Sequence, residues 1–124
     1  FELDGTIRYA NENFLNALGG YTLEEVKGKH HSIFAPPEVR DTPEYKQFWA
    51  DLRNGRFQAG EFRRISKTGK NVWIQASYNP ILDPDGRPYK VVKFAYDVTS
   101  QVQARMQAQA VLHRLGQKGE APLP

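Results

Sequence analysis

Two adjacent histidines, His30 and His31, are the residues of this chain best suited to chemistry. A neutral imidazole is a good axial ligand for haem iron, so either residue could hold that cofactor. The third histidine, His113, falls in a C-terminal stretch with a helical pattern, far from any expected pocket. The structural alternative for an adjacent pair is that one histidine packs inside the domain and the other faces solvent. Both interpretations stay open on sequence grounds.

The rest of the sequence offers no enzyme motif. It contains no cysteine, which removes disulfides, thiolate nucleophiles and cysteine-ligated metals. A glycine-rich phosphate loop, a nucleophile elbow, a His-x-x-x-His pair and an Asp-rich metal cluster are also missing. We therefore expect a protein that is not an enzyme. The lack of cysteine fits a reducing compartment, so we expect a cytoplasmic location.

Size and charge narrow the class further. With 124 residues the chain is long enough for one domain with its own core. Its 17 basic residues are interleaved with 14 acidic ones, so we expect no nucleic-acid partner. No apolar run reaches the roughly 18–20 residues of a membrane helix, so we expect no membrane contact in this segment. Because the chain begins at Phe1 rather than Met, we expect it to be part of a longer protein.

Alternation of residue type is clearest in the segment 71–82, which predicts a β-strand with two distinct faces. One face carries Val72, Ile74, Ala76 and Tyr78, and the other carries Trp73, Gln75, Ser77 and Asn79. Turn sequences at 67–70 and 83–86 connect this strand to strands expected over 56–66 and 89–97. The three runs predict an antiparallel meander. A small curved sheet closed on one side by short helices would enclose a pocket, which suits sensing.

Short helices are expected in the first half of the chain, after a hairpin over residues 1–10. Asn11 and Thr22 are placed to cap two of these helices, and the proline pair 36–37 is expected to prevent a helix. Thr42 is placed to cap a longer helix. The apolar face of that longer helix consists of Tyr45, Phe48, Trp49 and Leu52.

The chain is expected to end in a further helix that begins near Val98. Its Gln- and Ala-rich sequence carries a weak coiled-coil-like seam with 4-3-4 spacing. The residues of this seam are Ala104, Ala108, Val111 and Leu115.

In this order, the segments resemble the PAS sensory domain. They are most similar to PAS modules of bacterial methyl-accepting chemotaxis receptors of the energy-taxis and aerotaxis type. The resemblance covers about residues 1–110 and depends on the segments as a set. The matching segments are 3–7, 10–14, 20–25, 28–31, 44–49, 60–64, 72–81, 90–94 and 97–99.

The resemblance implies an α+β PAS fold. We expect a five-stranded antiparallel sheet in the order 2-1-5-4-3, with its first strand truncated, short helices on one face and a C-terminal exit helix. Residues 1–98 would form the sensory domain, 99–115 the output helix with its coiled-coil-like seam, and 116–124 a disordered tail.

The resemblance also implies a function and partners. The chain would be the sensory input domain of a chemotaxis signal transducer, sensing redox state, oxygen or a small ligand and signalling through its C-terminal helix. The expected partners are a second copy, giving a homodimer, and the downstream methyl-accepting signalling domain of the same chain. The alternative is a cofactor-free PAS module whose task is dimerisation or protein interaction.

Cofactor residues follow from the same resemblance. In flavin-binding aerotaxis receptors, residues matching His31, Asn11 and Trp49 lie at the FAD site. An Arg-His pair of those receptors corresponds to the segment 35–36 here, which removes a natural partner for the FAD diphosphate. The alternatives to FAD are haem b, with His30 or His31 as the iron ligand, and no cofactor.

Three aromatic or polar residues complete the candidate site. Phe34, Tyr78 and Asn79 join the histidines, Asn11 and Trp49 as residues expected to line the pocket. In the neighbouring pair Arg63-Arg64, at most one side chain could point inward at a ligand anion, and we expect both to be solvated.

Overall fold

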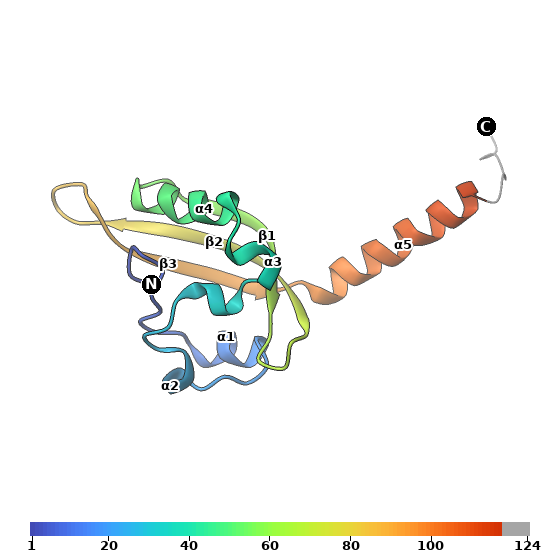
Figure 1. The fold of residues 1–124 in the computed structure, drawn as a ribbon, viewed down its shortest axis with the longest axis horizontal. Helices are drawn as coiled ribbons and strands as arrows, with labels where there is room; N and C mark the ends of the chain where they lie inside the picture. Colours follow the sequence, from blue (N-terminus) through green and yellow to red (C-terminus); the bar gives the residue numbers. More distant parts are fainter. Residues whose placement is uncertain (118–124) are drawn as a thin grey trace.

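Short helices come before a three-stranded sheet, and a long helix ends the chain (Figure 1). The computed structural model describes residues 1–117. In chain order its elements are α1 (Glu12–Ala17), α2 (Leu23–Val26), the 3-10 helix η1 (His31–Phe34), α3 (Pro37–Arg40), α4 (Pro43–Arg53), β1 (Gln58–Ile65), β2 (Asn71–Leu82), β3 (Pro88–Asp97) and α5 (Thr99–Gln117).

The sheet is the predicted meander, with its strands in the order β1-β2-β3 and both pairs antiparallel. Each expected strand is found within two residues of its predicted bounds at either end. In the β2–β3 turn, Asp83 Oδ1 accepts hydrogen bonds from the backbone nitrogens of Asp85 and Arg87. Local turn chemistry therefore sets the connections of the sheet.

The expected five-stranded sheet in the order 2-1-5-4-3 is wrong for this chain, which forms three strands. Two further strands were expected from residues 1–10, but only isolated pairs form there. Phe1 exchanges two backbone hydrogen bonds of 2.9 Å with Val91 on β3, and Thr6 makes a single bridge to His30. Residues 1–10 therefore contribute isolated backbone pairs to β3 and to His30 rather than ladders of several pairs.

The helix starts follow the predicted caps. The side chain of Asn11 accepts from the backbone nitrogen of Phe14, and Thr22 forms a complete capping box with Glu25. The side chain of Thr42 caps α4 by accepting from the backbone nitrogen of Tyr45. The proline pair does not prevent a helix, because α3 begins at Pro37, where the first helical position needs no N–H donor.

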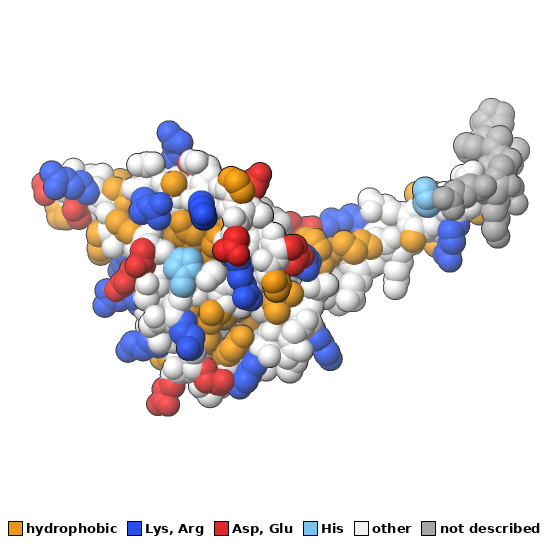
Figure 2. Space-filling view, in the orientation of Figure 1, with side chains coloured by type: hydrophobic (Ala, Val, Ile, Leu, Met, Phe, Trp, Pro, Cys, Tyr) orange, Lys and Arg blue, Asp and Glu red, His pale blue; other side chains and the backbone are white. Residues whose placement is uncertain are grey.

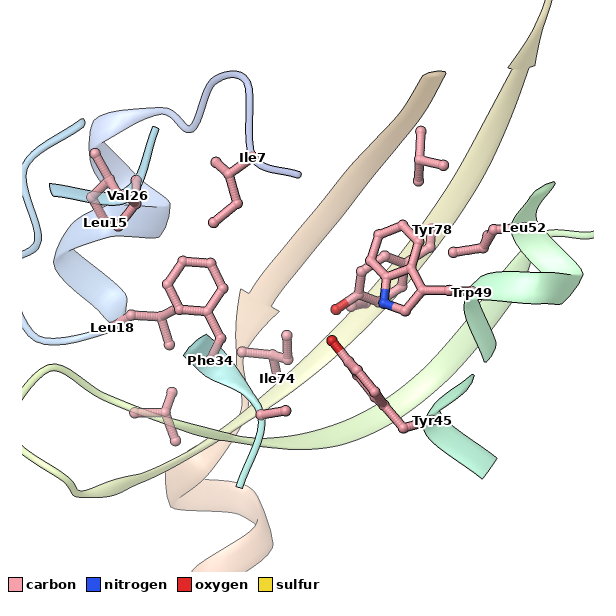
Figure 3. Packing of buried hydrophobic residues seen from close by; sticks show 14 residues of the cluster. Ile7, Leu15, Leu18, Val26, Phe34, Tyr45, Trp49, Leu52, Ile74 and Tyr78 are labelled. Carbon is pink, nitrogen blue, oxygen red and sulfur yellow. The ribbon is translucent and has the colours of Figure 1, made fainter. Parts of the chain in front are cut away.

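The core lies between the sheet and the helices that cover one face of it. The predicted face of β2 that carries Val72, Ile74, Ala76 and Tyr78 is buried, and α4 contributes Tyr45, Trp49 and Leu52 from its apolar face, with Phe48 packed against them. Figure 3 shows Tyr45 and Trp49 of α4 directed toward Tyr78 of β2. Further buried residues of the core are Ile7, Leu15, Leu18, Val26, Phe34 and Ile74.

Helix α5 continues directly from β3 and extends away from the rest of the domain (Figure 1). Val98 just before the helix and Val102 in its first turns are buried, and Arg105 pairs with Glu61 of β1. Figure 2 shows hydrophobic side chains exposed along the projecting part. The helix runs to Gln117, two residues past its expected end. The expected disordered tail falls mostly on residues 118–124, which lie outside the described residues. Within residues 1–117, no helix is long and apolar enough to cross a membrane.

Candidate functional site

A chain of hydrogen bonds crosses the middle of the core and includes His31. The imidazole is 0% exposed, because η1 places it between α4 and β2. Its Nδ1 lies 2.7 Å from the hydroxyl of Tyr45, and its Nε2 lies 2.9 Å from the hydroxyl of Tyr78. The hydroxyl of Tyr78 in turn accepts a 3.0 Å hydrogen bond from Nη2 of Arg64.

The guanidinium of Arg64 fixes one direction in this chain of hydrogen bonds. A guanidinium can only donate, so the hydroxyl of Tyr78 accepts from it. A phenol oxygen can accept a second hydrogen bond as well as donate one, so either neutral tautomer of His31 satisfies the contacts at Nδ1 and Nε2. In both tautomers each ring nitrogen has a tyrosine hydroxyl as its partner.

Burial keeps the members of this network in their neutral forms. Burial lowers the pKa of His31 well below 6.5, and the nearby cations Lys93 and Arg64 add to the effect. Burial also raises the pKa of Tyr45 to about 12 and raises the pKa of Tyr78 above its usual value. Near neutral pH the network therefore holds a neutral imidazole and two protonated phenols beside a charged guanidinium.

The expectation that both arginines of the pair 63–64 are solvated is wrong for Arg64, which is buried. Strand alternation gives the reason, because Arg64 lies on the same face of β1 as the partly buried Phe62. The guanidinium also lies over the ring of Phe62, 4.9 Å from its centroid. Arg63 lies on the other face, where it pairs with Glu38.

Lys93 is a second basic residue whose ionisable group is buried, and burial lowers the pKa of that group well below 10.5. It was not among the candidates from the sequence. It lies opposite Tyr78 in the β2–β3 pairing, so its side chain shares the core face of the sheet. Its ammonium lies 4.8 Å from the ring centroid of Tyr78 and 4.4 Å from that of Phe14. Its position opposite an inward-facing tyrosine was the signal that could have identified it.

His30 serves a local structural purpose. Its Nδ1 accepts a 3.0 Å hydrogen bond from the backbone nitrogen of Ser32 and so caps η1. Its Nε2 donates to the backbone oxygen of Asp4 at 2.7 Å. The ring packs tightly over Gly5, where an added Cβ would lie 2.5 Å from Nε2 and where the positive φ of 95° also favours glycine.

The structure brings together only part of the predicted site. His31, Phe34, Trp49 and Tyr78 are packed in one aromatic cluster, which Phe1 joins through its ring contacts with His31, Trp49 and Tyr78. Asn11 lies apart from this cluster, at the start of α1. Asn79 lies on the outer face of the sheet, where its amide donates to Ser77 and to the backbone of β3.

Neither haem nor FAD fits these residues as they are packed. Both ring nitrogens of His30 and of His31 already have hydrogen-bond partners, so neither histidine offers a free lone pair to iron. The residues implied for FAD do not line one cavity. His31 and Trp49 contact each other in the core with ring centroids 5.4 Å apart, whereas Asn11 faces a separate groove.

That groove follows β3 along the edge that β2 does not occupy, between the strand, the N-terminal segment and α1. Its volume is about 1270 Å³, above the roughly 300–1,000 Å³ of usual ligand pockets because it is open along the strand. Its inner wall is formed mainly by Phe1, Ile7, Phe14, Phe34, Ile74 and Lys93. A second, smaller hollow is lined by Tyr45 of the network together with His30 and Trp49.

The fold and the sequence together define the class of protein. Residues 7–95 match the family described as the PAS fold, so the chain belongs to the PAS family. The chain is 46% identical over 110 residues to Biofilm dispersion protein BdlA of Pseudomonas aeruginosa, a match that covers 89% of this chain. It spans only 26% of the length of that relative.

More distant matches agree with this assignment. Phototropin-1A of Oryza sativa subsp. japonica is 29% identical over 99 residues, which is 80% of this chain and 10% of that protein. The PAS domain of a protein from Colwellia psychrerythraea superposes with a TM-score of 0.69 at 22% identity, covering 80% of this chain and 82% of that one. An RNA-binding light-oxygen-voltage receptor superposes with a TM-score of 0.70 at 21% identity, covering 95% of this chain and 32% of that one. These structures share the fold.

Proposed function

We propose that this chain is the sensory input domain of a chemotaxis-type signal transducer, which responds to a small ligand and signals through α5. Its similarity to a biofilm dispersion protein supports a role in a behavioural response. The observation that carries the proposal is the junction between the sheet and α5.

The junction ties the start of α5 to the central strand rather than to a loop. The backbone nitrogen of Val98 donates to the backbone oxygen of Trp73 at 2.8 Å. The backbone nitrogen of Trp73 donates to Oγ1 of Thr99 at 3.0 Å, and Asp97 accepts from the backbone of Thr99 at 2.8 Å. A displacement of β2 or β3 would therefore move the helix, since no flexible segment separates them.

Among the signals considered, a small organic ligand has more support than oxygen or redox state. Oxygen or redox sensing needs a haem or flavin, and the packing of the histidines leaves no site for either group. The groove beside β3 is lined by residues of the strand that continues into α5. A ligand there would contact the element that leads to the output helix.

The proposal includes a homodimer and a signalling region beyond α5 in the same chain. Met106, Val111, Leu112 and Leu115 are exposed apolar residues on α5. A helix that projects alone in water is marginally stable, so these residues favour pairing with a second α5.

The test is a chemical analysis of the protein purified from cells, together with a distance measurement on α5. We expect a colourless protein that releases a small organic molecule on denaturation, detected by mass spectrometry. Spin labels at position 110, away from the seam of two paired helices, should report a changed distance when that molecule is added back. A Soret or flavin absorption band would contradict the proposed ligand class, and an unchanged distance would contradict signalling through α5.

The second candidate is a cofactor-free module whose task is dimerisation. The filled aromatic cluster around His31 favours it, because no space for a cofactor separates the rings. A dimer with no extractable molecule and no ligand response would support this candidate.

A further inference from the structure

Helix α5 contacts the sheet through a line of side chains near its start. Thr99, Val102 and Arg105 follow one another at intervals of three residues, so neighbouring members of this set lie side by side on the helix surface. Oγ1 of Thr99 accepts from the backbone nitrogen of Trp73 on β2, and Val102 is buried. Further along the helix, Arg105 forms an ion pair with Glu61 on β1. The contacts of α5 therefore pass from the central strand to the edge strand.

Glu61 lies on the outer face of the sheet, away from the helices that cover the core. In the β1–β2 pairing it is opposite Gln75, and Arg63 is opposite Trp73. Strand alternation places these four residues on the face opposite to the one that carries the buried Arg64. The ion pair with Arg105 therefore joins the output helix to the solvent side of β1, whereas the buried network uses the core side of the same strand.

The contact between Arg105 and Glu61 determines whether α5 can pivot. Two anchors fix the direction of a rigid helix, whereas a single anchor leaves it free to turn about that point. Thr99 and Val102 hold only the first turn of α5. Arg105 contacts the sheet six residues after Thr99, nearly two turns along the helix. From Gln103 to Gly116 the residues of α5 are exposed, so the direction of this stretch depends on the second anchor.

We propose that the ion pair between Glu61 and Arg105 sets the direction of α5, so that the output helix follows β1 as well as β2 and β3. This inference rests on the proposed signalling through α5 and names two positioning residues for it. β1 also carries Arg64, whose guanidinium donates to Tyr78 in the buried network. A displacement of this strand would therefore reach α5 through Arg105, without passing through the junction between β3 and α5.

The exposure of this ion pair suits a contact that can break and re-form. The side chains of Arg105 and Glu61 are 54% and 32% exposed. Ion pairs exposed to this degree contribute little to the stability of a fold, so losing this one would leave the domain folded. Salt also weakens such a pair, because the Debye length falls to about 3 Å at an ionic strength of about 1 M.

The experiment measures the direction of α5 as the distance between two spin labels in protein without ligand. The chain has no cysteine, so Lys46→Cys on α4 and Ala110→Cys on α5 provide two unique labelling sites, both exposed. Mixing with an excess of unlabelled protein confines the measured pairs to one chain. Position 110 lies about 16 Å along the helix from Thr99, so a pivot of about 15° would move it by about 4 Å.

Removing either charge should release the helix. Glu61→Gln and Arg105→Gln should each shift the mean distance or widen its distribution by about 3 Å or more. The charge-swapped double variant Glu61→Arg/Arg105→Glu should return the distribution toward that of the parent protein, because opposite charges again face each other. The matched control is Arg63→Gln, which loses an ion pair with Glu38 of α3 on the same face of the same strand. It should leave the distribution unchanged.

Three results would overturn the proposal. They are a distribution in Glu61→Gln equal to that of the parent protein, a double variant no closer to the parent than the single variants, and an equal shift in Arg63→Gln. Circular dichroism separates a pivot from unwinding, and a loss of helical signal in Glu61→Gln would also overturn it. These measurements are made without ligand. Their failure would leave the β3–α5 junction and the ligand response to the distance measurement between paired helices.

Discussion

The hydroxyl of Tyr78 is the point at which a charged strand residue and a buried imidazole meet. It accepts from Arg64 and is hydrogen-bonded to Nε2 of His31, so both neighbours depend on it for a hydrogen-bond partner. All three side chains are buried, and solvent cannot replace a lost contact. The consequences of removing one atom here are therefore larger than the loss of one hydrogen bond would suggest.

We predict that Tyr78→Phe destabilises the domain by about 2–4 kcal/mol. The substitution leaves Nη2 of Arg64 and Nε2 of His31 buried without partners, and one of these groups is charged. Urea unfolding followed by circular dichroism measures the change. The control is Tyr96→Phe on the same sheet, where the side chain is 66% exposed and a change within about 0.5 kcal/mol is expected. Equal effects of the two substitutions would mean that the network adds nothing to stability.

The neutral state of His31 predicts a dependence of stability on pH. Burial holds the pKa of His31 well below 6.5 in the folded protein, so the unfolded chain binds a proton that the folded chain refuses. Stability is therefore complete above about pH 6.5 and falls as the pH drops below that value, with a slope approaching 1.4 kcal/mol per pH unit.

Unfolding free energies between pH 5 and 7.5, compared with those of His31→Leu, isolate this contribution. The variant should be less stable at pH 7.5, because it leaves two phenol hydroxyls without a partner, but its slope below pH 6.5 should be smaller by about 1 kcal/mol per unit. Parallel pH profiles for the two proteins would show that His31 titrates normally in the folded state.

At the scale of elements, the sequence predicted the features that depend on contacts between residues close together in the chain. The caps at Asn11, Thr22 and Thr42 and the turns of the meander were predicted because the side chains that form them lie within four residues of the groups they bind. The number of strands was not predicted correctly, because pairing with β3 is a contact between residues far apart in the chain. The family pattern implied strands that this chain has only as the Phe1–Val91 pair.

The same distinction explains the candidate site. The sequence identified His31 and Trp49, which the fold does bury, but it could not show that two tyrosines occupy the ring nitrogens of His31. Arg64 and Lys93 were missed because their charged side chains suggested exposure to solvent, although the alternation of residues along each strand places both on the core face of the sheet. Conversely, Phe94 lies on the outer face with 67% exposure although its type suggested the core.

The junction between β3 and α5 gives a prediction at this scale. Thr99→Val keeps the shape of the side chain but removes the oxygen that accepts from the backbone nitrogen of Trp73. We expect the Trp73 amide to exchange with solvent faster and the domain to lose about 1 kcal/mol of stability. Hydrogen exchange followed by mass spectrometry measures the first effect. Ser100→Ala is the control, since that side chain is exposed on the next position of the helix. Unchanged protection at Trp73 would show that Thr99 does not anchor the strand to the helix.

At the scale of the whole molecule, the globular part and the projecting helix α5 have different surfaces. Basic and acidic side chains are intermixed over the globular part, whereas the projecting helix shows a mostly uncharged surface with apolar residues (Figure 2). Val98 and Val102 anchor this helix, and the following residues, from Gln103 to Gly116, are exposed. An apolar seam on an unsupported helix favours association with a second copy.

We therefore predict that the chain forms a dimer through α5 at tens of micromolar. Val111 and Leu115 are four residues apart on one face of the helix and are 45% and 47% exposed. Replacing both with Glu would place like charges on the seam of each helix, so sedimentation velocity should show a shift from dimer to monomer. Gln109→Glu adds charge to the same helix more than a quarter turn away from this seam and should leave the dimer intact. A parent protein that sediments as a monomer, or a double variant that remains a dimer, would mean that α5 is not the contact between copies. Contact through the sheet face around Phe94 would then be the next arrangement to examine, since its aromatic side chains are exposed as well.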